Sequence, residues 1–260
     1  MNLKSKIALA AIALTAGTAA MAQVSYNVGA VSDYRFRGIE QTAGQPSLQA
    51  GVDYAHSSGL YVGAWAANNI KWIKEFNGAS KGDYEVDVYG GYKFEVKGVA
   101  LDVGVITYNY PGNDSGAAGT TGAGNFSKAD TTEVYIGGTY SVATLKYYQS
   151  MGDFLGNLNS NGSRYWDLSA TFDLGNGFSL VPHVGKQTVP NQSSGSKIGN
   201  AADYMDYALT LNKDFGNGLS ASLAAVGTDT KENEFYQATS NGQNRWLGKS
   251  GVLVGVKYTF

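Results

Sequence analysis

The chain has 260 residues, 19 of them basic and 21 acidic, and its formal charge is -2. It holds no cysteine, which excludes disulfide frameworks and thiolate metal sites, and its mildly acidic charge argues against nucleic acid as a partner. With 35 glycines, 18 tyrosines and 4 prolines, it is rich in turn formers and in amphipathic rings that favour the boundary between water and lipid.

The first 22 residues are typical of a secretory signal peptide. Lys4 and Lys6 form a basic start, residues 7–15 are apolar, and Ala20, Met21 and Ala22 form a small-residue cleavage site. The apolar run is shorter than the roughly 20 residues that a spanning helix needs. We therefore expect residues 1–22 to be removed, which leaves a charge of 17 - 21 = -4. Residues 23–260 are expected to form a single domain, because no linker or shift in composition divides them.

Alternation of apolar and polar residues predicts twelve strands along the mature chain. Each is close to the roughly 9 to 11 residues of a tilted membrane strand, and an even number suits a closed antiparallel barrel. The predicted strands cover residues 24–33, 47–56, 60–69, 83–94, 98–109, 130–140, 142–150, 163–173, 177–187, 203–213, 217–227 and 250–260.

The connections between these strands alternate between short and long. Two short ones are near copies, at residues 173–179 and 214–220, and both contain Asn-Gly, which tolerates the positive φ angles of a tight hairpin. The long ones are polar, and the glycine-rich stretch 116–124 has too little apolar surface to order itself. Short periplasmic turns and long outer loops are typical of outer-membrane barrels.

A soluble β-sandwich would show the same alternation with its apolar faces turned inward, so periodicity alone does not choose between the two folds. The export signal, the asymmetry of the loops and the aromatic residues at strand ends favour the membrane barrel. We therefore expect an all-β fold, a transmembrane antiparallel up-and-down β-barrel of 12 strands.

Several stretches of the chain resemble the TorF family of porins over the full mature length. They are SDYRFRGI at residues 32–39, QT at 41–42, QAGVDY at 49–54, GLYVGAW at 59–65 and EVDVYGGY at 85–92. The resemblance implies a porin of no settled substrate, and it supplies no catalytic residues.

Strand parity predicts which charged side chains point into the barrel, and carboxylates outnumber bases among them. A surplus of carboxylates in a confined pore would attract cations, whereas the alternative is a network of ion pairs that fills the barrel. The predicted lumen-lining residues are Asp53, Glu85, Asp87, Lys93, Asp102, Glu133, Lys146, Asp167, Asp173, His183, Asp206 and Lys257.

Two arginines flank Phe36 in the first long loop. Arg35 and Arg37 are predicted to form a basic patch at the outer mouth, which would guide an anionic solute or contact lipopolysaccharide phosphates. The alternative is that they pack the loop against the rim of the barrel. The lysines of the second long loop, Lys71, Lys74 and Lys81, are predicted to be solvated or to contact lipopolysaccharide.

The chain offers little for catalysis or for a metal. Its only histidines are His56, at a predicted turn, and His183, which lies roughly 13 Å along the strand from the inward Ser179. A serine on a neighbouring strand stays open as a partner. No loop has the spacing of a calcium-binding hand or a phosphate-binding loop. We expect no enzyme activity, no cofactor and no metal site.

The sequence therefore predicts a Gram-negative cell outer-membrane porin for passive transport of small hydrophilic solutes, with a preference for cations. The alternative is a non-conducting barrel with a structural, adhesion or surface-recognition role through its outer loops, and a filled interior would favour it. Val256, Tyr258 and Phe260 share the outward face of the last strand and resemble the signal read by the barrel-assembly machinery. The expected partners are outer-membrane lipid, lipopolysaccharide, that machinery and the solutes, and the protein is expected to be a monomer.

Overall fold

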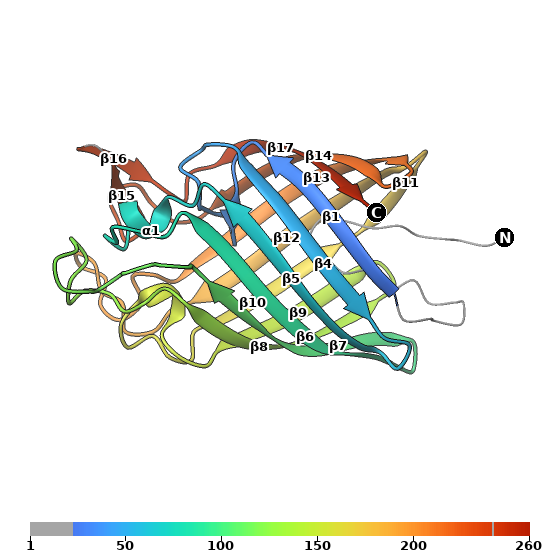
Figure 1. The fold of residues 1–260 in the computed structure, drawn as a ribbon, viewed down its shortest axis with the longest axis horizontal. Helices are drawn as coiled ribbons and strands as arrows, with labels where there is room; N and C mark the ends of the chain where they lie inside the picture. The colour runs from blue at the N-terminus through green and yellow to red at the C-terminus, as the bar shows by residue number, and fades with distance from the viewer. Residues whose placement is uncertain (1–22, 241) are drawn as a thin grey trace.

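The computed structural model describes residues 23–240 and 242–260, which form a closed antiparallel β-barrel (Figure 1). The signal peptide expected at residues 1–22 lies outside the described residues. Twelve strands make the wall, as the alternation predicted, and β10 and β11 together count as one of them because both pair with β12. Pairing of β1 with β17 closes the cylinder.

Neighbouring strands in the wall are neighbours in the chain, so the topology is up-and-down. The wall strands are β1 (Gln23–Val31), β4 (Ser47–Ala55), β5 (Leu60–Asn68), β6 (Tyr84–Val96), β7 (Val99–Asn109), β8 (Thr131–Tyr140), β9 (Ala143–Ser150), β10 (Arg164–Ala170), β11 (Phe172–Gly175), β12 (Phe178–Thr188), β13 (Tyr204–Gly216), β14 (Leu219–Thr228) and β17 (Gly251–Thr259). Their bounds lie within a few residues of those predicted.

All tight connections lie at one end of the barrel, called here the turn end, and all long ones lie at the other, the loop end (Figure 1). The two Asn-Gly turns have the expected geometry, with φ of 52° and 78° at Asn176 and Gly177, and of 50° and 86° at Asn217 and Gly218. Positive φ at both central residues matches the right-handed twist of the strands that such a turn joins.

The outer face of the barrel is an exposed apolar belt. On β17, for example, Val252, Val254 and Val256 are 67%, 56% and 50% exposed, while the alternate residues point into the barrel. Burying so much apolar surface against lipid is what a membrane-spanning barrel requires. No helix in the described residues is long and apolar enough to cross a membrane.

The long loops carry structure of their own at the loop end, which the sequence did not predict. Among the described residues, these loops form two hairpins and two short helices, namely β2 (Arg35–Phe36), β3 (Ile39–Glu40), α1 (Trp72–Glu75), η1 (Phe154–Gly156), β15 (Gln237–Ser240) and β16 (Gln243–Trp246). Buried apolar side chains from these loops, among them Ile39, Ile70, Trp72, Ile73 and Leu247, pack with the inward-facing Tyr108 and Tyr204 of the wall. The loop end of the barrel therefore has a hydrophobic core.

The glycine-rich stretch 116–124 is ordered by contacts with the second long loop. Gly122 N donates to Gly78 O over 3.3 Å, and the Thr121 hydroxyl donates to the same oxygen over 3.1 Å. The expectation that this stretch cannot order itself overlooked these contacts, which backbone groups supply without any apolar surface. The first long loop, residues 32–46, enters the barrel.

Candidate functional site

The first long loop forms the hairpin β2–β3, whose tip reaches the wall on the far side of the lumen. The loop leaves β1, yet its tip lies against β8, β12, β13 and β14. Arg37 and Gly38 form the turn with φ of 47° and 80°. A Cβ at residue 38 would lie 2.7 Å from Thr228 Cγ2 and 2.8 Å from Asp206 Cβ, so the tip fits only because glycine stands there.

Arg37 fixes this tip to the far wall through its guanidinium group. Nη1 donates to Glu133 Oε1 over 3.1 Å and to Gln187 Oε1 over 2.8 Å, and Nη2 lies 2.5 Å from Glu133 Oε2. The group also stacks on rings, with its Cζ 4.2 Å from the Tyr165 centroid and 5.1 Å from that of Tyr148. Removing one partner of such a buried, hydrogen-bonded pair costs about 3–5 kcal/mol.

The charge on Arg37 is held by its carboxylate partner. Burial by itself would lower the pKa of Arg37, but the adjacent Glu133 carboxylate outweighs burial, so that the pKa is raised above its ordinary value. A raised pKa means that the Arg37 guanidinium is charged at every pH below the ordinary pKa of arginine, so the physiological pH range does not deprotonate it. The hairpin is therefore held by a bond that does not titrate on its arginine side.

The base of the same hairpin is tied to the sixth long loop, residues 229–250. Arg35 bonds to Asp33 over 2.9 Å, to Glu40 over 3.2 Å and to the carbonyl of Lys249 over 2.5 Å. The buried Glu40 also accepts from Arg245 over 2.6 Å. The first and last loops of the chain are thus joined by charge-assisted bonds at the loop end.

Below the hairpin, a row of tyrosines lines the wall. Strand register aligns Tyr135, Tyr148 and Tyr165 on β8, β9 and β10, and continues through Gly104 and Gly91 to Tyr61 on β5. The glycines leave room for the rings: a Cβ at Gly91 would lie 2.7 Å from the Tyr61 hydroxyl. The hydroxyls of Tyr61 and Tyr135 meet, and Tyr61 also donates to Asp102 over 2.6 Å.

Charged side chains nearer the turn end are engaged with one another or with the tyrosines. Lys146 lies 3.3 Å from Asp102, and Lys93 lies 4.8 Å from the centroid of Tyr61. Asp53 accepts from the Tyr89 hydroxyl over 2.6 Å. These contacts match the network that the sequence left open as an alternative to free pore charges.

His183 lies in another part of this network, on β12. Its Nε2 is 2.8 Å from Asp206 Oδ1 and its Nδ1 is 3.4 Å from Asp167 Oδ1, while the Tyr165 hydroxyl donates to Asp206 over 2.9 Å. Both ring nitrogens therefore face carboxylates. Register places Ser169 beside His183, yet the histidine has no nitrogen left to activate that hydroxyl. Within the described residues, no cluster of three or more histidine, cysteine or acidic side chains could hold a metal.

Glu85 and Asp87 stand apart from the other inward carboxylates. They lie two residues apart on β6, are 0% and 7% exposed, and each keeps one buried oxygen without a hydrogen-bond partner among the residues that the structure describes. Glu85 Oε1 accepts from the Tyr34 hydroxyl over 3.2 Å. Buried carboxylate oxygens without a partner are costly when they are ionised, which sets this pair apart from the paired carboxylates of the wall.

Strand pairing puts all twelve predicted lumen residues on the inward face, but Asp173 lies at the turn end, is exposed and caps its own turn through Gly175 N. Arg35 and Arg37 lie at the loop end with side chains only 5% and 6% exposed, so they do not form a patch open to solvent. This geometry corresponds to the alternative in which the two arginines pack the loop against the barrel, because their guanidinium groups pair with carboxylates inside the loop and across the barrel.

Sequence reasoning missed the tyrosine row, Gln187 and the crossing hairpin. Inward parity with Glu133 gives Tyr135, and parity with Asp167 gives Tyr165, so the row could have been found by applying parity to uncharged residues as well. The sequence signal for the hairpin is weak and consists of the Arg37-Gly38 pair at its turn, flanked by Phe36 and Ile39.

Most of the chain matches a known sequence family. The sequence model of a family described as "Bacterial protein of unknown function (Gcw_chp)" matches residues 15–260. The chain belongs to the Gcw_chp family. No curated protein matches it. The family description names no porin, so the resemblance to the TorF family stays an expectation.

Several of the solved structures that are similar to this Gcw_chp member are porins. The NanC porin matches with a TM-score of 0.52 and 11% identity, over 91% of this chain and 99% of that one. The KdgM porin in complex with disordered oligogalacturonate matches with a TM-score of 0.51 and 6% identity, over 91% and 98%. At such identities the likeness shows a shared fold, a porin-like barrel of nearly the same extent.

Proposed function

We propose that the protein is an outer-membrane channel for passive diffusion of small hydrophilic solutes, with a preference for cations, and that the first long loop narrows its outer entrance. The observation that carries the proposal is a closed barrel with an apolar outer belt and a polar, carboxylate-rich inner wall. In the proposed orientation in the outer membrane, the loop end faces outward and the turn end faces the periplasm, as is typical of such barrels. The porin-like fold supports a channel but says nothing of the solute.

The preference for cations rests on the charges that line the path. Strand register places more carboxylates than lysines on the inward face of the wall. Low-dielectric walls strengthen the field of such charges, which raises the local concentration of cations. A protonated amine or a metal cation would therefore enter more readily than an anion of equal size.

A second candidate function is favoured by the packing at the loop end. The hydrophobic core of the loops and the Arg37–Glu133 ion pair cover the outer entrance, as a barrel with a structural or surface-recognition role would require. In that case the loops would be the functional surface and the lumen a filled interior. The two candidates differ in whether ions cross the barrel.

Conductance with the hairpin fixed and released separates the two candidates. Refolded protein is placed in planar bilayers under a potassium chloride gradient, as wild type and as Arg37→Ala. The channel proposal expects a reversal potential of the sign for potassium preference, and a conductance at least about twofold larger for Arg37→Ala, because the lost ion pair frees the hairpin. Arg164→Ala, an exposed arginine on the outward face of β10, is the matched control.

Each outcome of this experiment has a fixed meaning when resistance to sodium dodecyl sulfate shows that the proteins are folded. Folded protein that conducts in neither form supports the non-conducting barrel and overturns the channel. A chloride preference overturns the proposed selectivity. Equal conductance of wild type and Arg37→Ala overturns the role given to the first long loop.

A further inference from the structure

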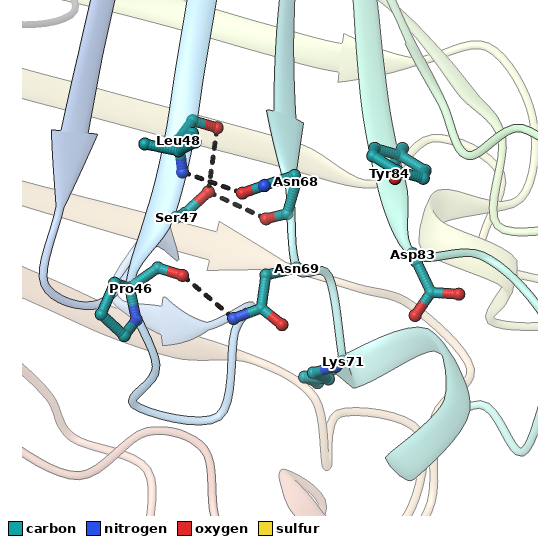
Figure 2. A pocket seen from close by; sticks show the side chains of 8 residues that line it. All are labelled: Pro46, Ser47, Leu48, Asn68, Asn69, Lys71, Asp83 and Tyr84. Atoms are coloured by element: carbon teal, nitrogen blue, oxygen red, sulfur yellow. Dashed lines mark hydrogen bonds between the residues drawn. The ribbon is translucent and has the colours of Figure 1, made fainter.

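Two adjoining hollows lie on the outside of the barrel, at the outer rim of β4, β5 and β6, and the proposed channel does not involve them. Each has a volume of about 380 Å³, within the usual range for ligand sites. The hollow nearer the loop end, called here the upper hollow, is polar and lies where the strands leave the barrel (Figure 2). The hollow nearer the turn end, called here the lower hollow, is apolar and lies on the lipid-facing wall. Leu48, Asn68 and Tyr84 line both, so the two are continuous.

The lower hollow exists because small residues replace large ones in one registered row. Val28, Ala50, Ala66 and Val86 are successive partners across β1, β4, β5 and β6, all on the outward face. The two alanines form a low floor between the valines. Leu48 and Tyr84, which are 62% and 59% exposed, rise above it as side walls. The groove so formed fits a hydrocarbon chain lying along the wall.

The upper hollow has fixed polar walls. Asn68 Oδ1 accepts from Leu48 N over 2.8 Å, the Ser47 hydroxyl donates to Asn68 O over 2.9 Å, and Asn69 Nδ2 donates to Pro46 O over 3.0 Å (Figure 2). These bonds tie the end of β4 to the end of β5. A ligand would therefore meet a preformed rim, which lowers the entropy lost on binding.

The charge of the upper hollow is positive. Asp83 lines it, but its carboxylate is paired with Lys74. Lys71 also lines it and, within residues 23–240 and 242–260, forms no ion pair. One uncompensated ammonium group thus stands at the rim, directly above an apolar groove. An ammonium group in this position suits a phosphate on a lipid headgroup.

We propose that this surface binds one phosphorylated glycolipid of the outer leaflet, with a lipid A phosphate at Lys71 and an acyl chain in the groove over Ala50 and Ala66. The depth agrees with this occupant, because the polar part lies at the rim of the loop end and the apolar part lies within the exposed belt. The site is separate from the lumen, so it holds whether or not the barrel conducts.

Native mass spectrometry of the refolded full chain in detergent tests the proposal, with lipid A as the probe. Phosphate-free lipid A and phosphatidylethanolamine are the comparison lipids. One lipid A is expected to bind with higher affinity than either comparison lipid. Lys71→Ala should weaken its binding about tenfold, because a charge-assisted bond is lost, and Ala66→Leu should weaken it by about the same factor by filling the groove.

Matched variants elsewhere on the barrel serve as controls. Lys128→Ala removes an exposed lysine of the third long loop, and Ala225→Leu adds the same bulk on the outward face of β14. Neither should change lipid A binding. Equal affinity for phosphate-free lipid A, unchanged binding in Lys71→Ala and Ala66→Leu, or a dimer that Ala66→Leu dissolves would each overturn the proposal, the last by giving the groove to a second copy of the chain.

Discussion

At the scale of single residues, the inner wall depends on glycines that make room for tyrosine rings. Gly185 on β12 is the tightest case, because a Cβ there would collide with the Tyr165 hydroxyl and would lie 2.5 Å from Asp206 Oδ2. The same two groups also contact His183 Nε2. A glycine in the middle of a strand is usually a weakness, and here the packed tyrosine explains it.

Gly185→Ala is therefore expected to lower the free energy of unfolding by about 1–3 kcal/mol, as overpacking does elsewhere. Urea unfolding in lipid vesicles, followed by tryptophan fluorescence, measures the change. Gly152→Ala is the control: no heavy atom lies within 4 Å of the added Cβ, and its effect should stay within about 0.5 kcal/mol. Equal stability of the two variants would contradict the fit between Gly185 and Tyr165.

At the scale of elements, the turn-end hairpins keep the strands in register. Gly98 and Gly177 occupy the same place in two such turns, with φ of 81° and 78°. The surroundings differ, because a Cβ at Gly177 would collide with the carbonyl of Asp214, whereas nothing lies within 4 Å of one at Gly98. The pair therefore separates backbone strain from steric contact.

Gly98→Ala is expected to cost about 1–2 kcal/mol, the price of a left-handed alanine. Gly177→Ala should cost at least about 1 kcal/mol more, because the hairpin must also move away from β13. The difference between the two urea midpoints, at equal slopes, is the measurement. If Gly98→Ala and Gly177→Ala lower the free energy of unfolding equally, the close approach to Asp214 does not affect the stability of the turn.

At the scale of the whole molecule, the barrel depends on closing β1 against the last strand. Tyr26 and Phe260 exchange backbone hydrogen bonds of 2.9 Å in both directions, and their rings stack at 5.8 Å. Phe260 also stacks on Tyr258 at 5.7 Å. The aromatic carboxyl terminus is thus part of the closing seam, in addition to its proposed role as an assembly signal.

Phe260→Ala is expected to reduce folded protein in the outer membrane of expressing cells by more than it reduces unaided refolding into vesicles. The lost stacking accounts for about 0.5–1.5 kcal/mol per ring pair in both settings, whereas recognition by the assembly machinery acts only in cells. Phe215→Ala, an exposed phenylalanine at the same end, is the control. Equal losses for Phe260→Ala in cells and in vesicles would remove the proposed signal.

Local patterns in the sequence are enough to predict the wall of the barrel. A strand has a period of two residues, so the alternation around Glu85 and Asp87, or around Val254 and Val256, predicts both the strand and its two faces. Asn-Gly pairs fix turns through local φ preferences, and even the direction of each lumen side chain follows from parity.

The cover of the loop end, in contrast, depends on contacts between residues that lie far apart in the chain. Arg37 bonds to Glu133 and Gln187, which are 96 and 150 residues away in the sequence. Periodicity and local preferences act over a few residues, so they cannot predict such contacts. The same holds for the outer groove, where Ala50 and Ala66 become a floor only because register sets them side by side between larger residues. Local chemistry thus fixed the barrel, whereas contacts between distant loops and strands fixed its entrance and its proposed lipid site.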